Sequence, residues 1–293
     1  MRFVSYRDGG RTLGGVLVEK RVTALAAATD RMTGLRQPIS SVRGFLTAFG
    51  TDLPRALDRL GAVIDSGDVA STPLSDLQLS APVPNPSKVI CVGLNYVSHV
   101  GETGRALPTH PDLFAKFDTS LIGPTDEIHG REISPNLDFE GELAIVIGRR
   151  ARHVHEDEAL AHVAGAMILN DISARDLQWR GTQWLAGKAI DGSTPTGPSL
   201  VTLDEIPDLQ DLTIVTRVNG VEMQRGSTAQ QIFSVAHVVA DLSTIMTLSP
   251  GDVIATGTPD GIGGKRNPPV WLDGGDVVEV EITGLGVLEN RVA

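Results

Sequence analysis

Residues 138–148 read Asp-Phe-Glu-Gly-Glu-Leu-Ala-Ile-Val-Ile-Gly, so three acidic residues at alternate positions lead into an unbroken apolar run. The apolar run predicts a buried strand. Side chains at positions i and i+2 share one face of a strand, so the carboxylates of Glu140 and Glu142 are expected side by side. Two such carboxylates repel each other and resist desolvation, and a cation between them would remove both problems. An all-oxygen ligand set indicates a hard ion, Mg²⁺ or Mn²⁺. The alternative is a strand that starts at a solvated edge, with its acids in water.

A third carboxylate, that of Asp171, follows a second apolar run at residues 166–170. Like Glu140, it stands where a buried strand is expected to meet a loop. With Glu140 and Glu142 it would complete a site that leaves room for waters or for a chelating substrate. Taken singly, Asp171 could instead be a turn cap.

His99 and Glu102 stand three residues apart in a segment that directly follows the apolar run through Cys91. On one helical turn this spacing puts both side chains on one face, where the carboxylate can orient the imidazole and raise its basicity. Such a pair could take a proton from water. The alternative is a solvated surface pair.

The composition is that of an ordinary globular protein, with 41% hydrophobic and 21% charged residues in 293. The formal net charge of −11 argues against nucleic acid or an anionic membrane as partner, because both require clustered Lys and Arg. No apolar stretch resembles a signal peptide or a membrane span. The single cysteine, Cys91, lies in an apolar run and is expected in the core, which favours the reducing cytoplasm.

The chain is expected to form two domains, a small α/β domain over residues 1–75 and a larger, strand-rich domain over residues 76–293. The alternate prolines at 82, 84 and 86 predict an extended linker near this boundary. Apolar periodicity predicts one helical stretch over residues 45–60 and two later helices, over 156–163 and about 228–248. Strands are predicted over residues 2–6, 15–18, 22–25, 88–92, 143–147, 166–170, 213–218, 253–256 and 277–283.

Six motifs together resemble the fumarylacetoacetate hydrolase family, in the family's order and over about residues 82–293. They are GLNYVSH at 93–99, DFEGELAIVIG at 138–148, NDISARDLQ at 170–178, Lys188 with TGPSLV at 196–201, TGTPDGIG at 256–263 and GDVVEVEITGLGVLENRV at 275–292. The resemblance implies an α+β fold built on a mixed β-sandwich roll, in most cases a homodimer, with Mg²⁺ or Mn²⁺ at the mouth of the roll.

Carried over residue by residue, the resemblance assigns the metal to Glu140, Glu142 and Asp171, as the carboxylate pattern does. It implies that His99 and Glu102 activate water on a mobile lid over residues 96–110 and that Lys188 stabilises an oxyanion or enolate. The residues implied to contact the substrate are Lys116, Arg175, Gln178 and Thr258.

Some positions depart from the family's pattern. Phe117 stands where many members have proline and Asp260 where alanine is common, so two loops that face the substrate could suit a different ligand. Asp138 is no ligand in the family, and we expect it behind the ligands or in solvent. The histidines without a matching role are expected at the surface; they are His110, His129, His153, His155, His162 and His237.

The predicted reaction is hydrolysis of a carbon–carbon bond in a 1,3-diketo acid such as an acylpyruvate or fumarylpyruvate, through an enolate chelated by the metal, in aromatic catabolism. Water activated by His99 would attack the distal carbonyl. Decarboxylation of oxaloacetate-like acids or isomerisation of 2-hydroxydienoates would use the same enolate and remain alternatives. A remote alternative from another class is a metal-binding homologue without catalytic activity.

Overall fold

The computed structural model describes residues 1–32 and 35–293. Its strands are β1 (Arg2–Asp8), β2 (Arg11–Val18), β3 (Arg21–Ala24), β4 (Ser71–Pro73), β5 (Gln78–Ser80), β6 (Val89–Gly93), β7 (Asp112–Lys116), β8 (Leu121–Ile122), β9 (Leu137–Asp138), β10 (Gly141–Ile147), β11 (Val163–Asn170), β12 (Ser173–Ala174), β13 (Thr194–Thr202), β14 (Thr213–Val218), β15 (Val221–Ser227), β16 (Val253–Ala255), β17 (Val277–Ile282) and β18 (Gly286–Arg291). Its α-helices are α1 (Leu25–Asp30), α2 (Val42–Phe49), α3 (Leu53–Asp65), α4 (Val97–Thr103), α5 (Arg175–Gln178), α6 (Leu185–Lys188) and α7 (Val235–Ile245). The 3₁₀ turns are η1 (Gly50–Asp52), η2 (Leu74–Asp76), η3 (Asp118–Ser120), η4 (Glu156–His162), η5 (Leu203–Glu205), η6 (Thr228–Gln230) and η7 (Gly263–Lys265).

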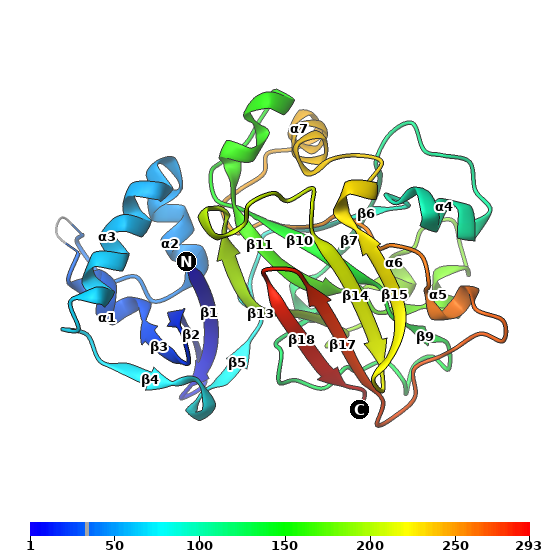
Figure 1. The fold of residues 1–293 in the computed structure, drawn as a ribbon, viewed down its shortest axis with the longest axis horizontal. Coiled ribbons are helices and arrows are strands. Elements are labelled where there is room, and N and C mark those ends of the chain that lie inside the picture. Colours follow the sequence, from blue (N-terminus) through cyan, green and yellow to red (C-terminus); the bar gives the residue numbers. More distant parts are fainter. Residues whose placement is uncertain (33–34) are drawn as a thin grey trace.

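The described residues form two larger sheets and a two-stranded sheet of β9 and β12. A twelve-stranded mixed sheet of these residues runs in the order β4-β3-β2-β1-β13-β11-β10-β16-β6-β7, with β5 paired to β1 and β8 to β13. A four-stranded antiparallel sheet, β15-β14-β17-β18, lies in front of its central strands in Figure 1. A large mixed sheet with a second sheet packed on it confirms the predicted α+β class.

Strand β10 lies at the centre of the large sheet, and all seven of its residues are buried. Leu143, Ile145 and Ile147 face one core, which they share with α7 and the four-stranded sheet. Ala144 and Val146 face the opposite core, which they share with α2 and α3. Because both faces of β10 are covered, the strand reads as a continuous apolar run rather than an alternating one.

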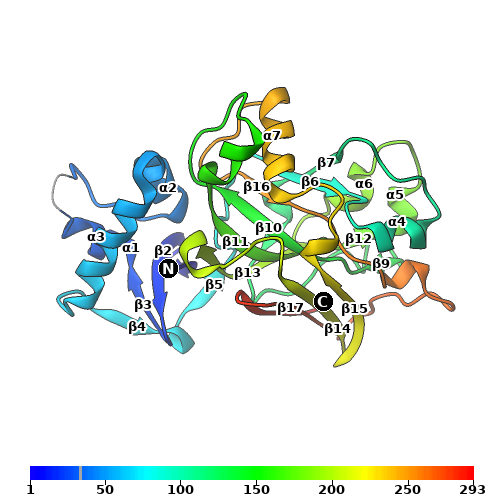
Figure 2. The same ribbon diagram turned by 45° about the horizontal axis from the view of Figure 1, so that its top comes forward.

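The N-terminal elements extend the large sheet instead of forming a sheet of their own. Strand β1 pairs antiparallel with β13, with Phe3 opposite Leu200, and Phe3 packs in the core that contains Val146. In Figures 1 and 2 these elements lie to one side of the molecule, with α2 and α3 above β1–β3. The division at residue 75 into two domains stays a prediction.

The helical stretch predicted over residues 45–60 is two helices, α2 and α3, joined by η1. Pro54 lies in the first turn of α3, where a missing N–H is tolerated. Gly50 packs on the backbone near the end of β10: a Cβ there would lie 1.8 Å from the carbonyl oxygen of Gly148. The chain turns at this contact, so a single straight helix was the wrong prediction.

The helix predicted over residues 228–248 is also shorter in the structure, because tertiary hydrogen bonds hold residues 232 and 233 in a bend after η6. The Ile232 N–H donates to the Asn95 carbonyl at 2.8 Å, and the Phe233 N–H donates to Asn95 Oδ1 at 2.8 Å. Helix α7 begins only after Ser234, whose side chain accepts from the His237 N–H.

Two further expectations differ in detail. The helix predicted over residues 156–163 is the 3₁₀ segment η4, in which only Ala159 is buried, so it has little apolar face to stabilise a regular α-helix. The proline segment at 82–86 forms neither helix nor strand, as expected, but it is packed rather than a free linker. Val83 is fully buried, and the Ser5 hydroxyl donates to the Pro82 carbonyl at 2.8 Å.

Candidate metal centre and active site

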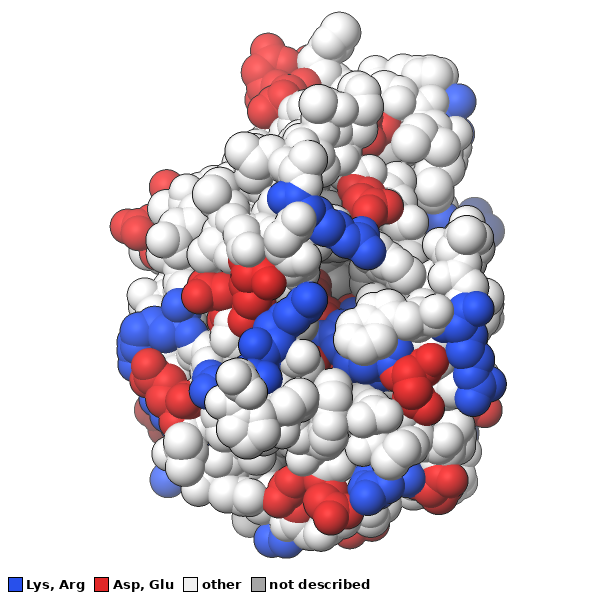
Figure 3. All heavy atoms as spheres, turned by 90° about the vertical axis from the view of Figure 1, so that its right-hand side faces the viewer, with Lys and Arg blue, Asp and Glu red and all other residues white. Residues whose placement is uncertain are grey.

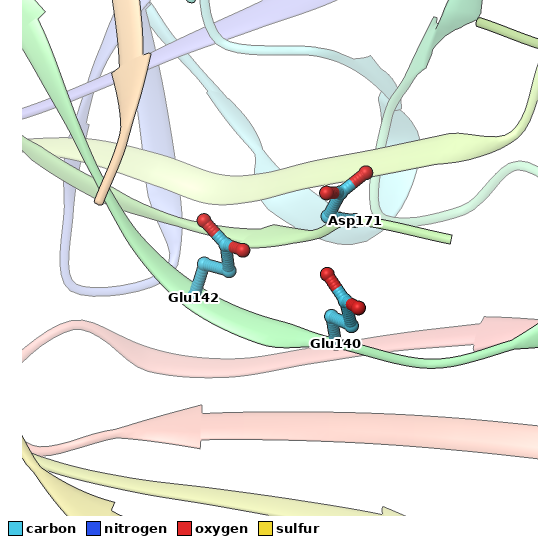
Figure 4. A group of neighbouring side chains, drawn as sticks. All are labelled: Glu140, Glu142 and Asp171. Carbon is cyan, nitrogen blue, oxygen red and sulfur yellow. The ribbon is translucent and has the colours of Figure 1, made fainter. Parts of the chain in front are cut away.

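Glu140, Glu142 and Asp171 meet at one end of the β10–β11 pair. Gly141 lies opposite Asn170 in this antiparallel pair, and the Asp171 N–H donates to the Glu140 carbonyl at 2.8 Å. This register makes Glu140 and Asp171 neighbours across the strands and puts Glu142 two positions along β10 on the same face. One carboxylate oxygen of each residue lies within 4.8 Å of the other two, and all three residues are buried (Figure 4). The structure thus brings together the three predicted ligands.

Two lysines, both buried, neutralise part of this cluster. The Lys188 ammonium, from the end of α6, donates to Glu140 Oε2 at 2.7 Å and to Asp171 Oδ2 at 2.6 Å. Lys116, from the end of β7, donates to Asp171 Oδ1 at 2.7 Å. Lys188 is therefore where the sequence predicted it, beside the ligands. Lys116 contacts the oxygen of Asp171 that Lys188 does not contact, and it does not line the cavity described below.

A second buried ion pair supports Glu140 from the start of α5. Arg175 donates through Nη2 to Glu140 Oε1 at 2.5 Å, through Nε to Asp138 Oδ2 at 2.8 Å and through Nη1 to Gln178 Oε1 at 2.9 Å. Asp138 is fully buried, so of the two predicted environments the solvated one is wrong. Arg175 is thus held in place by a carboxylate on one side and an amide on the other.

The surroundings of Glu140 and Glu142 shift the pKa values of their carboxyl groups in opposite directions. Burial by itself would raise the pKa of the Glu140 carboxyl, but the charges of Lys188 and Arg175 outweigh burial and hold this pKa well below its usual range. Burial, with the negative charges of Asp171 and Glu140, raises the pKa of Glu142 well above its usual range. Within residues 1–32 and 35–293 no Lys or Arg nitrogen lies within 4.0 Å of the Glu142 carboxylate, which accepts from the Gly257 N–H at 2.9 Å. The carboxylate that lacks a cation is therefore Glu142.

This donor set fits a divalent metal ion. The three carboxylates supply only oxygen ligands, which Mg²⁺ and Mn²⁺ prefer. A cation bound among them would compensate the buried charge of Glu142, which the neighbouring lysines leave unpaired. The structure and the chemistry of the donors thus agree on a hard divalent ion, without separating Mg²⁺ from Mn²⁺.

His99 and Glu102 form the pair that the sequence predicted, on helix α4. His99 Nδ1 lies 3.1 Å from Glu102 Oε2, and the other oxygen, Oε1, accepts from the Gly261 N–H at 3.0 Å. His99 is 7% exposed, so the pair is not a solvated surface pair. In the tautomer with its proton on Nδ1, this nitrogen donates to the Glu102 carboxylate, and Nε2 keeps a lone pair that can act as a base.

A cavity of about 240 Å³ is lined by His99 of this pair and by two of the three carboxylates, those of Glu140 and Glu142. Among its lining residues are His99, Glu140, Glu142, Arg175, Gln178, Lys188 and Thr258, seven of the ten predicted site residues. Figure 3 shows the face of the molecule on the right-hand side of Figure 1, where Lys and Arg side chains, together with Asp and Glu side chains, lie around a hollow. Thr258 lines this cavity, but its hydroxyl already donates to the Gly141 carbonyl at 2.9 Å.

Sequence reasoning missed a further part of this cavity. Phe114, Trp179, Trp184, Arg105 and Lys265 also line it. The only signal for Arg105 was its place in the predicted lid, and Lys265 stands two residues after the TGTPDGIG motif with no periodicity to mark it. These side chains reach the cavity from five separate segments, which only the tertiary fold brings together.

The segment over residues 96–110 is anchored at its start by two buried side chains. Tyr96 and Val100 are 0% and 2% exposed. Helix α4 ends at Gly104 in the left-handed conformation, with φ of 71°, and most residues from 104 to 110 are exposed. The predicted mobility of the segment stays a prediction, now confined to its second half.

The predicted surface histidines lie where expected or nearly so. His110, His129, His153 and His155 are exposed, and His162 and His237 are half-buried.

Within the described residues, none of the helices has the length and apolar character needed to cross a bilayer.

Comparisons with known proteins give matches over most of the chain. The sequence model of the fumarylacetoacetate hydrolase C-terminal domain matches residues 88–293. Mitochondrial oxaloacetate tautomerase FAHD2A of Homo sapiens is 47% identical over 222 residues, 75% of this chain and 71% of the relative.

Two solved structures share the whole fold. The fumarylacetoacetate hydrolase of Exiguobacterium antarcticum is 36% identical with a TM-score of 0.84, covering 100% of this chain and 99% of its own. The maleylpyruvate hydrolase of Sphingobium sp. SYK-6, in complex with manganese(II) and pyruvate, is 28% identical with a TM-score of 0.79 and the same coverage.

Proposed function

The chain belongs to the fumarylacetoacetate hydrolase family, and on this premise we propose that it is a divalent-metal-dependent enzyme that interconverts the keto and enol forms of oxaloacetate. The observation that carries the proposal is that one cavity is lined by Glu140 and Glu142 of the buried carboxylate triad and by the paired imidazole of His99. The triad suits a cation that binds the 2-oxo acid group, and the imidazole suits proton transfer at the adjacent carbon. The name of the 47% identical relative supports this choice of substrate.

The metal and the protein would divide the task of stabilising the enolate. A divalent cation held by Glu140, Glu142 and Asp171 would supply Lewis acidity at the 2-carbonyl oxygen of the substrate. Lys188 holds a fixed positive charge at the same place, because burial alone would lower its pKa but the neighbouring Asp171 and Glu140 raise it. A charge that is already in position when the enolate forms needs no reorganisation.

His99 performs the proton transfer in this proposal. Its Nε2 takes a proton from C3 of the keto form, and the electrons of the broken C–H bond form the C2–C3 double bond. The same proton then passes to the oxygen on C2, so the imidazole ends as it began. Glu102 stabilises the imidazolium that exists between these two transfers and keeps the ring oriented, as Gly261 keeps Glu102 oriented.

The predicted hydrolysis of an acylpyruvate or fumarylpyruvate is the second candidate. The His99–Glu102 pair could equally activate a water molecule, and a structurally similar maleylpyruvate hydrolase holds manganese and pyruvate. Decarboxylation of oxaloacetate and isomerisation of a 2-hydroxydienoate would need the same enolate and stay alternatives. The carbon dioxide measurement in the test below reports the decarboxylation.

The test compares the reactions directly. Wild-type protein with Mg²⁺ receives enol-oxaloacetate, acetylpyruvate and fumarylpyruvate at equal concentrations, with Mg²⁺ alone as the blank, and loss of enol, of diketo acid and of carbon dioxide are followed separately. We expect enol loss from oxaloacetate to be fastest and to disappear in His99→Ala. Hydrolysis of a diketo acid at a tenfold higher rate, about 1.4 kcal/mol in transition-state stabilisation, would replace the tautomerase proposal by the hydrolase.

The oligomeric state, the partner and the compartment of the enzyme are further proposals. We keep the predicted homodimer and the small 2-oxo acid as its partners. The buried, unpaired thiol of Cys91 is compatible with a reducing compartment. The cytoplasm stays a prediction, because the printed name of the human relative places that protein in mitochondria.

A further inference from the structure

The mouth of the active-site cavity carries two cations that the site itself does not use. Four Lys or Arg side chains line the cavity: Arg105, Arg175, Lys188 and Lys265. Arg175 and Lys188 are buried and paired with carboxylates. Arg105 and Lys265 are exposed, and in the described part of the chain neither has a carboxylate oxygen within 4.0 Å of its side-chain nitrogens. These two charges are therefore available to a bound anion.

Arg105 is held over the cavity by aromatic side chains. Its guanidinium carbon lies 5.5 Å from the centre of the Trp184 ring, a distance typical of a cation–π contact. Trp184 in turn packs edge-on against Phe114, with ring centres 5.5 Å apart, and all three residues line the cavity. The contact orients the guanidinium without neutralising it, so its N–H groups stay free to donate.

Lys265 comes from a different segment of the chain, at the end of η7. The two residues before it, Gly263 and Gly264, donate their N–H groups to the buried carboxylate of Asp138 at 2.7 and 2.9 Å, which fixes the base of this turn. The bond between the Gly261 N–H and Glu102 ties the same loop to helix α4, three residues before Arg105. The two cations therefore stand on segments that are joined beside the cavity.

We propose that Arg105 and Lys265 bind the second carboxylate of a dicarboxylic 2-oxo acid and so select such acids over 2-oxo acids with an apolar end. This inference rests on the proposed function, since the 2-oxo acid group of the ligand is taken to lie at the triad. The far end of a short ligand then points to the cavity mouth, where the unpaired charges are. In a chain of net charge −11, two uncompensated cations at this mouth also attract anions to it.

Binding measurements can separate the contribution of the second carboxylate to affinity from that of the rest of the ligand. We would titrate Mn²⁺-loaded protein with 2-oxoglutarate and with 2-oxopentanoate, which have equal carbon counts and the same 2-oxo acid group but end in a carboxylate and a methyl group. Arg105→Ala and Lys265→Ala should each weaken 2-oxoglutarate about tenfold, the loss expected for one charged hydrogen bond, and 2-oxopentanoate less than threefold. Arg105→Lys should recover part of the loss. Arg11→Ala and Lys20→Ala, which remove exposed charges elsewhere, should change neither constant.

Several results would overturn the proposal: equal affinity of the wild type for both acids, equal losses for both acids in the variants, or no loss for 2-oxoglutarate. Turnover distinguishes this proposal from the proposed function. Wild-type activity on oxaloacetate with no charge-selective loss in the variants would overturn only the role of Arg105 and Lys265. The selective binding loss without any oxaloacetate turnover would sustain that role and refute the tautomerase.

Discussion

Replacing Asp138 by Asn tests whether the buried ion pair behind the metal ligands supports the fold. Asp138 is fully buried and accepts four hydrogen bonds, from the N–H groups of Phe139, Gly263 and Gly264 at 2.7–2.9 Å and from Arg175 Nε at 2.8 Å. Asn has nearly the same shape but only one accepting oxygen. At least one of the donors would therefore face an amide N–H₂, and the buried guanidinium of Arg175 would lose one of its two carboxylates.

The magnitude follows from this burial. Breaking a buried ion pair by changing one partner costs about 3–5 kcal/mol, because the remaining charge stays in a dry environment. No discount for solvent screening applies, since neither side chain is more than 5% exposed. At roughly 2–4 °C per kcal/mol for a chain of this size, the melting temperature should fall by about 10 °C.

The measurement is urea unfolding of the wild type, Asp138→Asn and the control Asp58→Asn. Asp58 is exposed on α3, so the control should stay within about 0.5 kcal/mol of the wild type. A free energy of unfolding for Asp138→Asn that also stays within this range would refute the reasoning. It would mean that Arg175 finds a new partner or that water reaches the site.

Three further predictions concern the metal and the base. Chelation should abolish activity, and Mg²⁺ or Mn²⁺ should restore it. Glu142→Gln should lose Mn²⁺ affinity and activity together and keep the wild-type circular dichroism spectrum. Full activity of metal-free protein would contradict the assignment of the metal site. His99→Ala should bind Mn²⁺ and oxalate as the wild type does but lose about 10²–10⁴-fold in kcat, because its role is proton transfer; loss of Mn²⁺ in this variant would show that His99 is a ligand instead. Because the pKa of Glu142 is raised well above its usual range, metal-free protein should keep a proton there above the pH at which an ordinary carboxyl loses it, and Mn²⁺ should displace this proton, so Mn²⁺ affinity should rise with pH. Calorimetry in buffers of different ionisation enthalpy should show this proton release, and the absence of any release would contradict the raised pKa.

The metal centre could be predicted from the sequence because short-range geometry determines most of it. Glu140 and Glu142 share a strand face by the two-residue period alone, and Asp171 ends the next apolar run. The pairing of these two strands, with Gly141 opposite Asn170, then brings the third carboxylate to the other two. The His99–Glu102 pair is equally local, since three residues on one helix suffice to form it.

Predictions failed where long-range hydrogen bonds outweighed local preference. Apolar periodicity over residues 228–248 favoured one helix, but Asn95, more than a hundred residues away, holds the Ile232 and Phe233 backbone in a bend outside the helix. Periodicity reports which face of a segment is apolar, and it contains no information about a distant amide that competes for the same N–H groups.

The sequence by itself predicted the class of fold. It determined that Glu140 and Glu142 share one strand face and that His99 and Glu102 share one helical turn, because each of these pairs depends on spacing within a single element. Only the tertiary structure decided that Asp138 is a buried support for Arg175, that Glu142 is the carboxylate without a cation, and that Arg105 and Lys265 share a cavity mouth. The physical reason is that ion pairing and burial depend on distances between side chains far apart in the chain. These distances exist only once the sheets, α4 and η7 have packed together.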